Sequence, residues 1–262
     1  PCMNLEEIDS LRKSHGLAKW SMSAGLYGSK IQVIGQKRNL KKQIRSLGKV
    51  FFLSHFAISF IEKYIWFIKR QPRILQNFFN QCLWFIARKK ITSVEMLPFV
   101  HRLLQGQPTE FFVRHAYFKN NMRPDHDIHP ARDGCGVTWF APIVPNQGED
   151  VERAVRLGED LYKKYSFEHH VALIFHSSRS VVILMSIFYK RDDPDEWARA
   201  DALLKELIGV FKDANYLEYR TGPSCMSGSL DDIFAYKKFL SDMKKSIDPD
   251  GILAPGRYGI EV

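Results

Sequence analysis

Four side chains that are able to bind a metal ion occur together in the middle of the sequence. They are the two carboxylates and two imidazoles of the run Asp125-His126-Asp127-Ile128-His129. Carboxylate and imidazole groups are common ligands of zinc and other transition metals. The run lies in a polar segment without helical spacing, which holds ligands poorly, and no second cluster offers more of them. We therefore expect a solvated or interface loop and no metal site.

A second group with possible chemistry is formed by three serines around Cys225. They are Ser224, Ser227 and Ser229. A serine nucleophile of a hydrolase needs a strand-turn-helix context and a paired base. Neither is present at this place in the sequence, so a hydrolase is not predicted.

The most distinctive stretch is at the C-terminal end. It opens with Glu-Tyr-Arg-Thr-Gly at 218–222, continues through a helical pattern to Ser246, and ends in the run DPDGILAPGRYGI at 248–260. Pro249 cannot continue a helix, and the glycines of the run permit positive φ or close backbone approach. Such a rigid coil suits packing against another surface, although an ordinary C-terminal loop has the same punctuation.

These residues resemble the C-terminal signature of the FAD-linked oxidases of the vanillyl-alcohol oxidase and para-cresol methylhydroxylase type. In that family a Tyr-Arg-Thr tripeptide precedes a helix, and the chain ends with Asp-Pro-x-Gly-Ile-x-Ala-Pro-Gly-Lys/Arg-x-Gly. The matching positions are Tyr219, Arg220, Thr221 and the run from Asp248 to Gly259. The resemblance continues in family order through 20–28, 131–145, 170–190 and 194–214, whereas the stretch 56–90 has no counterpart that we can match.

The resemblance implies a role for five residues. Tyr219 and Arg220 would be catalytic, because a phenol whose oxygen meets a guanidinium and a tyrosine hydroxyl ionises more easily and then loses hydride to the flavin. Arg132 and Trp139 would line the substrate side, and Arg257 would lie near the cofactor. The residues alone permit a different interpretation, in which the arginine is buried against a carboxylate and the tyrosine belongs to the core.

The cofactor that the resemblance implies is FAD, bound only in a complete protein. The family's N-terminal half, which holds the diphosphate cradle, has no counterpart here, since no Gly-rich loop leads into a helix N-terminus. The strand expected at 180–190 carries Val181 and Val182 and no histidine, so the comparison implies FAD without a covalent tether. His176 in the preceding turn is a poor substitute, because the strand register would have to slip. The sequence begins with Pro1 and not Met, from which we expect a processed product, an engineered form or a fragment.

Hydrophobic periodicity and turn signals predict an α+β fold, in which an antiparallel sheet flanked by helices is built from ferredoxin-like units. Residues 1–215 would form the cap domain, with a helical insertion at 56–90, and 216–262 would pack on the missing FAD-binding domain. The expected helices are 4–15, 31–46, 93–104, 148–165 and 194–214. The expected strands are 20–27, 49–53, a segment within 109–121, 134–145, 170–175 and 180–190.

The stretch 56–90 combines many aromatic residues with seven basic residues and one acid, Glu62. Pro72 is expected to divide it into two helices, neither of which is apolar enough to span a membrane. Either the stretch packs on the body of the protein, or it contacts a membrane surface or a subunit. The body of the protein or another subunit is expected to cover four aromatic side chains, those of Trp66, Phe67, Trp84 and Phe85. If they lie bare, the chain should bind vesicles in a way that weakens with salt.

The chain of 262 residues carries a formal net charge of +9, which favours an acidic partner, a membrane surface or an acidic neighbouring domain. Four widely spaced cysteines and the absence of a secretory signal favour a cytoplasmic protein, with membrane association left open. The expected partners are a small aromatic substrate, the FAD-binding half and a homo-oligomer, but not nucleic acid. The alternative function is a non-catalytic interaction module that uses 56–90.

Overall fold

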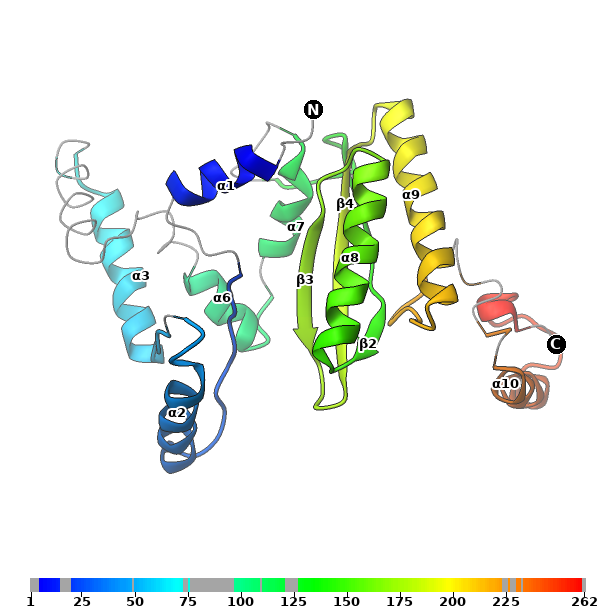
Figure 1. Cartoon of the computed structure of the whole chain (residues 1–262), viewed down its shortest axis with the longest axis horizontal. Coiled ribbons are helices and arrows are strands. Elements are labelled where there is room, and N and C mark those ends of the chain that lie inside the picture. Colours follow the sequence, from blue (N-terminus) through cyan, green and yellow to red (C-terminus); the bar gives the residue numbers. More distant parts are fainter. Residues whose placement is uncertain are drawn as a thin grey trace. The chain divides into compact units, whose positions relative to one another are not determined.

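The structure is a computed structural model of the chain. It describes residues 5–14, 20–48, 50–72, 75, 97–108, 110–120, 127–222, 226, 230–231 and 233–260. The chain divides into two compact units, Leu5–His115 and Ala116–Val262. Figure 1 shows the elements of both, and each unit is described by itself.

The larger unit is built around one long central strand, β4 (Ser180–Lys190). All of its partners are antiparallel to it. One edge of β4 pairs with β3 (His170–Phe175), and the other edge pairs with β1 (Cys135–Phe140) and then β2 (Ile143–Pro145). The strands β1 and β2 lie end to end along this edge, because β1 pairs with residues 185–190 of β4 and β2 pairs with residues 180–182.

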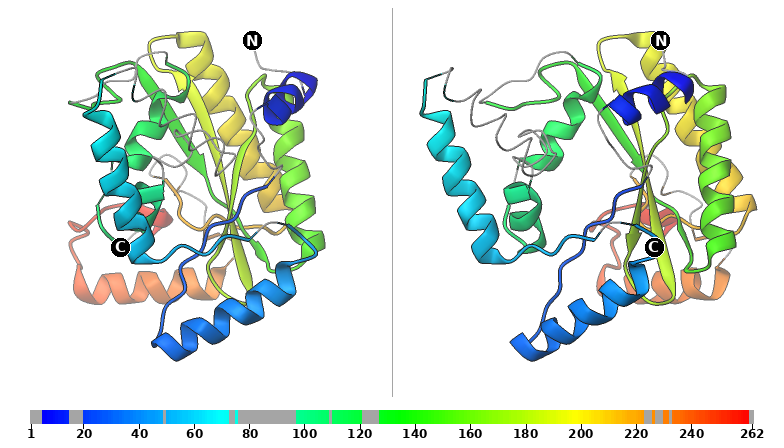
Figure 2. Two further views of the ribbon diagram at one scale, coloured as in Figure 1. Left: turned by 90° about the vertical axis from the view of Figure 1, so that its left-hand side faces the viewer. Right: turned by 60° about the vertical axis from the view of Figure 1, so that its left-hand side comes forward.

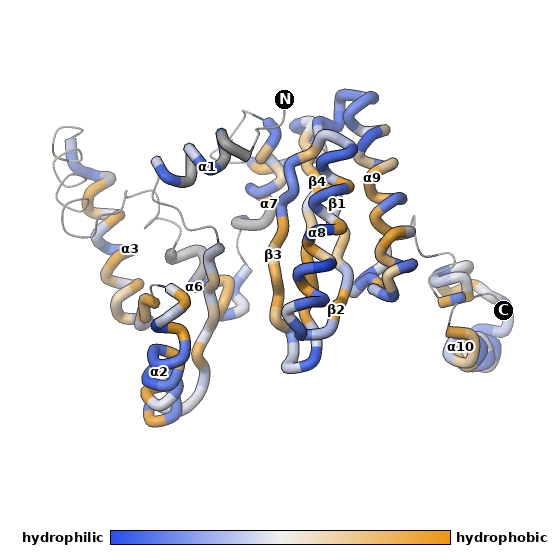
Figure 3. Tube along the Cα trace, viewed as in Figure 1, coloured by the Kyte–Doolittle hydropathy of each residue, from blue (hydrophilic) through white to orange (hydrophobic). Residues whose placement is uncertain are grey.

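Two helices cover one face of this sheet, as Figure 2 shows: α8 (Gly148–Lys164) and α9 (Pro194–Asp213). The helix α9 begins where Asp193 caps its N-terminus and Pro194 occupies the first turn, both of which favour helix initiation. Apolar residues at helical spacing on both helices alternate with polar ones (Figure 3). They form one buried core with alternate residues of β4, and its fully covered members include Tyr162, Leu203, Leu207, Phe211, Val181, Ile183, Met185 and Ile187.

The predicted α+β class and the antiparallel sheet flanked by helices are confirmed. The hairpin strands have the expected bounds, 170–175 and 180–190, because alternating apolar residues flank a polar four-residue turn. The expected strand at 134–145 is divided at Pro142, which has no N–H to donate. The described residues contain one β-α-β-β-α unit, in which β1 and β2 together act as the first strand.

Three expected strands are wrong. The described residues of 20–27 and 50–53 have no regular structure, and 110–118 forms the short helices α7 (Phe111–His115) and η1 (Ala116–Phe118). The composition of these segments suits a strand, but a strand also needs a partner with which to exchange backbone hydrogen bonds. In α7 the local pairing of Arg114 with Glu110, at 3.1 Å, fits a helical turn instead.

The smaller unit contains the helices α1 (Leu5–Ser14), α2 (Lys30–Ile44), α3 (His55–Lys69) and α6 (Leu97–Leu104). The helices α3 and α6 pack together, with Arg102 Nη2 lying 3.2 Å from Glu62 Oε1 and the rings of His55 and His101 5.2 Å apart. No helix within the described ranges is long and apolar enough to cross a bilayer.

The aromatic side chains of α3 contradict the expectation that the body of the protein covers them, whereas cover by another subunit stays a prediction. Trp66 is 57% exposed and Phe67 is 48% exposed, so the rest of the chain does not largely cover them. The guanidinium of Arg70 stacks over the Trp66 ring at 3.7 Å. The helix α3 ends before Pro72, as expected, while Trp84, Phe85 and the predicted second helix lie outside the described residues.

A partly buried histidine, His169, lies between α8 and the sheet, with its Nε2 atom fully covered. The ring of His169 packs against that of Tyr162, with the centroids 4.8 Å apart, and neither Nε2 of His169 nor the hydroxyl of Tyr162 has a hydrogen-bond partner in the described part of the chain. Burial, aided by the neighbouring His170, lowers the pKa of His169 from 6.5 to about 4, and burial also raises the pKa of Tyr162. The folded chain therefore holds His169 in its neutral form.

This neutral histidine predicts acid sensitivity. Because the pKa is lower in the folded than in the unfolded chain, the contribution to stability is complete above pH 6.5 and is lost as the pH falls toward 4. We expect the loss to reach on the order of 3 kcal/mol in urea unfolding. His169→Leu should flatten this part of the profile, whereas His176→Leu, at an exposed position, should not. An unchanged slope in His169→Leu would contradict the assignment.

Candidate functional site

The break between β1 and β2 positions the Glu-Tyr-Arg motif. Pro142 O accepts from Ile183 N of β4 at 2.9 Å, so the backbone groups of its two neighbours point to the other side. There, Ala141 O accepts from Tyr219 N at 2.7 Å, and Ile143 N donates to Leu217 O at 2.8 Å. Residues 217–219 thus continue the sheet outward in an antiparallel bridge. The motif is fixed through its backbone, which leaves its side chains to project.

Tyr219 and Arg220 lie together at an open surface. The guanidinium carbon of Arg220 is 5.9 Å from the centre of the Tyr219 ring, which is within range of a cation–π contact. The Tyr219 ring also approaches His176, in the turn of the β3–β4 hairpin, with 6.4 Å between centroids. Tyr219 is 51% exposed, and Arg220 is exposed.

The described residues do not show a buried arginine paired with a carboxylate. Arg220 forms no ion pair with any described acid, and Tyr219 is not part of the core. The neighbouring Glu218 is half-buried, and burial raises the pKa of its carboxyl group. The exposed guanidinium of Arg220 and the hydroxyl of Tyr219 are hydrogen-bond donors. Such donors are suited to binding an anionic or ionisable oxygen of a small molecule.

Trp139 lies on the sheet face opposite α8 and α9. It pairs with Ser186, one position before the core-facing pair of Phe140 and Met185, and its side chain is 51% exposed. Ile174 of β3 is also exposed on this face, paired with Val182. Val181, in contrast, is fully buried under the helices. An aromatic side chain on the uncovered face is available to a ligand, so the predicted role of Trp139 remains a prediction with a suitable geometry.

Arg132 is occupied by two carboxylates in the loop before β1. Its Nη1 lies 2.7 Å from Asp127 Oδ2, and its Nε lies 2.9 Å from Asp133 Oδ1. This guanidinium, together with the Tyr117 hydroxyl, holds the pKa of Asp133 below its usual range. Arg132 therefore orders a loop, and the structure does not bring it into described contact with Tyr219 or Arg220.

The loop that could have bound a metal is partly described. Asp127 pairs with Arg132, and His129 Nδ1 accepts a hydrogen bond from the backbone of Arg132 at 3.1 Å. Asp125 and His126 lie outside the described residues. The residues that are described contain no group of three side chains suited to hold a metal ion.

Arg257 lies in a tightly turned tail. It is exposed in η3 (Arg257–Gly259), where Gly256 and Tyr258 have φ of 69° and 57°. Glycine adopts this left-handed region without strain, whereas Tyr258 does so at a cost. No described contact joins Arg257 to Tyr219 or Arg220, so its proposed place near a cofactor depends on a surface outside this chain.

Asp248 organises the tail, and sequence reasoning missed this role. Its buried carboxylate accepts hydrogen bonds from the backbone N–H groups of Ile252 and Leu253, both at 2.9 Å, and pairs with Lys244 Nζ at 2.7 Å. These contacts lower its pKa, with the lysine as the largest cause. The available signal was Asp248-Pro249-Asp250-Gly251, since an aspartate before such a turn commonly binds its own backbone.

Four helix N-termini, those of α2, α3, α8 and α9, do not suit the diphosphate of FAD. A phosphate site needs free N–H groups at a helix N-terminus without negative side chains. The first turns of α8 and α9 carry Glu149, Asp150, Asp195 and Glu196, and the N-termini of α2 and α3 are capped by serines. A dinucleotide would therefore have to be held largely by other residues.

Comparison with known proteins identifies relatives of this chain. No model of a protein family matches it. It is 29% identical over 253 residues to the 1'-carboxy-chondrochloren decarboxylase of Chondromyces crocatus, covering 96% of this chain and 44% of that protein. It is 23% identical over 256 residues to the flavoprotein subunit of 4-cresol dehydrogenase [hydroxylating] of Pseudomonas putida, covering 97% and 40%.

Two solved structures share the fold. One is p-cresol methylhydroxylase with substrate bound, with a TM-score of 0.69 and 22% identity over 99% of this chain and 42% of that chain. The other is 4-ethylphenol oxidase from Gulosibacter chungangensis in complex with isoeugenol, with a TM-score of 0.72 and 15% identity over 99% and 43%.

The chain thus spans less than half the length of each of these proteins. The sequence matches and the shared fold agree with the signature at 219–221 and 248–259. This chain is thus similar to FAD-linked oxidases of the vanillyl-alcohol oxidase and para-cresol methylhydroxylase type over less than half of their length, and it shares their fold there.

Proposed function

We propose that this chain is the substrate-binding portion of an FAD-dependent oxidoreductase that oxidises a para-substituted phenol or an aromatic alcohol. The observation that carries the proposal is the exposed pair Tyr219 and Arg220, fixed by backbone pairing at the sheet edge and without a carboxylate partner among the described residues. The relatives support it, because two of them are named for cresol and ethylphenol chemistry. They favour the enzyme over a non-catalytic interaction module.

The residues of this chain would act on the substrate oxygen. Arg220 donates to a phenolate through a fixed fork of N–H groups, and the Tyr219 hydroxyl donates to the same oxygen, so both favour the ionised phenol. Trp139 offers an apolar wall on the uncovered sheet face. The flavin, when bound, would accept the hydride, while the protein supplies position and charge. FAD would be held without a covalent tether, chiefly by residues outside this chain, with Arg257 beside it.

Segment 216–262 would pack on the FAD-binding half. Its helix α10 (Phe234–Ile247) has no buried residue, and it presents large apolar side chains to solvent. The turn that follows adds Ile252 and Leu253, which are also exposed. Apolar surface of this kind is usually covered in a functional assembly. The exposed side chains of α10 are Phe234, Tyr236, Phe239, Met243 and Ile247.

The cofactor prediction is that this chain purifies colourless, because the N-termini of α2 and α3 are capped by serines and those of α8 and α9 carry acids. Mixing it with a separately produced FAD-binding half should yield a yellow complex that is bleached by a para-substituted phenol. An absorbance spectrum of each sample measures both effects. The substrates should include phenols with and without a carboxyl group on the side chain, since one relative is a decarboxylase. Stoichiometric FAD in the isolated chain would contradict the proposal.

A further inference from the structure

The helix α2 has one partly covered face and one exposed face, and the exposed face carries both basic residues and isoleucines. Val33, Lys37, Leu40 and Ile44 are partly covered and recur at helical spacing on one side. The opposite side is exposed throughout. We call it the α2 stripe, and its members at i, i+3, i+7, i+10 and i+14 are Ile31, Ile34, Arg38, Lys41 and Arg45.

The charge of α2 has no counterpart nearby. Between residues 30 and 45 there are six basic side chains and no acid. None of the six forms an ion pair with a carboxylate in the described ranges, although Lys37 lies over the Phe52 ring at 5.7 Å. A row of unpaired cations repels itself, so the helix gains stability when an anionic surface approaches it.

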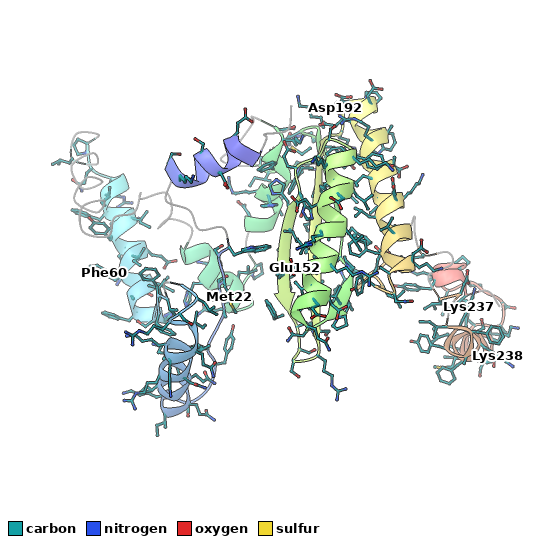
Figure 4. The ribbon with its side chains drawn as sticks, in the orientation of Figure 1. Met22, Phe60, Glu152, Asp192, Lys237 and Lys238 are labelled. Atoms are coloured by element: carbon teal, nitrogen blue, oxygen red, sulfur yellow. The ribbon has the colours of Figure 1, made fainter. Side chains whose placement is uncertain are left out.

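Large apolar side chains lie exposed in the same unit. Ile31 of the stripe is 84% exposed, and on α3 Phe56 and Phe60, one turn apart, are 82% and 64% exposed. Phe60 is labelled on α3 in Figure 4. Lys63 continues their row at the next turn and is also exposed. Trp66 is exposed with Arg70 stacked on it. Tryptophan, phenylalanine and isoleucine among cations are typical of segments that insert into a lipid interface.

From these observations we propose that α2 and α3 bind the surface of an anionic phospholipid bilayer. The cations of the α2 stripe would contact the headgroups, while Ile31, Phe56 and Phe60 would enter the acyl boundary. Charge alone also fits nucleic acid or an acidic protein. Nucleic acid, however, does not explain aliphatic side chains exposed among the cations, since it offers them little apolar surface. A bilayer interface satisfies both the charge and the apolar residues.

Vesicle flotation of the chain tests this proposal. We expect binding to vesicles of equal parts phosphatidylcholine and phosphatidylserine, and much less to phosphatidylcholine alone. Each basic residue near such a surface contributes about 1 kcal/mol. Loss of the three positive charges should therefore lower the partition coefficient on the order of 100-fold, and the reversal Arg38→Glu/Lys41→Glu/Arg45→Glu should lower it by at least that much. Ile31→Ser/Ile34→Ser should also bind less, and its residual binding should disappear at about 1 M salt, where screening is strong.

The control reverses three exposed basic residues of the larger unit, Lys163→Glu/Arg179→Glu/Arg191→Glu, which changes the net charge equally. It should retain most of the binding. Circular dichroism shows whether each variant is folded. If the charge-reversal variant of α2 does not fold, the milder variant Arg38→Gln/Lys41→Gln/Arg45→Gln replaces it in the test. Equal loss in the control, no binding by the wild-type chain, or binding to short duplex DNA with none to vesicles would overturn the proposal.

Discussion

Replacing Arg220 by alanine in the complete enzyme is expected to lower kcat/KM for a para-substituted phenol by roughly 100- to 1,000-fold. This corresponds to about 2.7–4 kcal/mol, the scale of removing one charged donor from a developing anion. The expected loss follows from the position of Arg220, an exposed cation whose guanidinium carbon lies 5.9 Å from the centre of the Tyr219 ring. Steady-state kinetics with the reconstituted protein measures the effect.

Two further variants make this test specific. Arg220→Lys should recover only part of the activity, since a point charge lacks the fork that meets one oxygen with two N–H groups. Arg179→Ala removes a nearby exposed cation in the hairpin turn and should leave kcat/KM within about twofold, since uninvolved surface changes have small effects. If Arg220→Ala keeps full activity while FAD is bound, the phenolate role of the pair is wrong.

Phe211→Ala is expected to lower the free energy of unfolding by about 3–5 kcal/mol. Phe211 is fully buried on α9, and its ring meets Phe140 of β1 edge to face, with centroids 5.0 Å apart. It also lies 6.2 Å from the ring of Tyr216, just before the Glu-Tyr-Arg motif. Truncation leaves a cavity between the helix and the sheet. Urea unfolding followed by circular dichroism measures the loss.

Trp197→Ala is the matched control on the same helix. The sequence predicts that Trp197 belongs to the apolar face of 194–214, but the structure shows its side chain 59% exposed. We therefore expect a change of less than about 1 kcal/mol, as is usual for exposed positions. An equally large loss in both variants would mean that α9 does not pack on the sheet as described here.

The core of the larger unit could be predicted from the sequence. The strands 170–175 and 180–190 and the helix starting at Pro194 have strong local signals, namely alternation, a polar turn and a capped proline. The strands expected near Trp20 and Lys49 had only composition in their favour. A strand is completed by a partner, and local composition does not say whether one exists.

In the candidate site, too, some features follow from the sequence and others only from the tertiary structure. The sequence determined the Tyr219-Arg220-Thr221 motif, the run 248–259 and, through them, the resemblance to the FAD-linked oxidases. Only the tertiary structure decided that Tyr219 meets His176 and that Arg132 is engaged by Asp127 and Asp133. The contact between Tyr219 and His176 joins the β3–β4 turn to the segment that pairs with Ala141 and Ile143. It depends on strand register and on the break at Pro142, and a one-residue slip would turn each side chain to the other face. The contacts of Arg132 lie within one loop and depend on how its backbone turns.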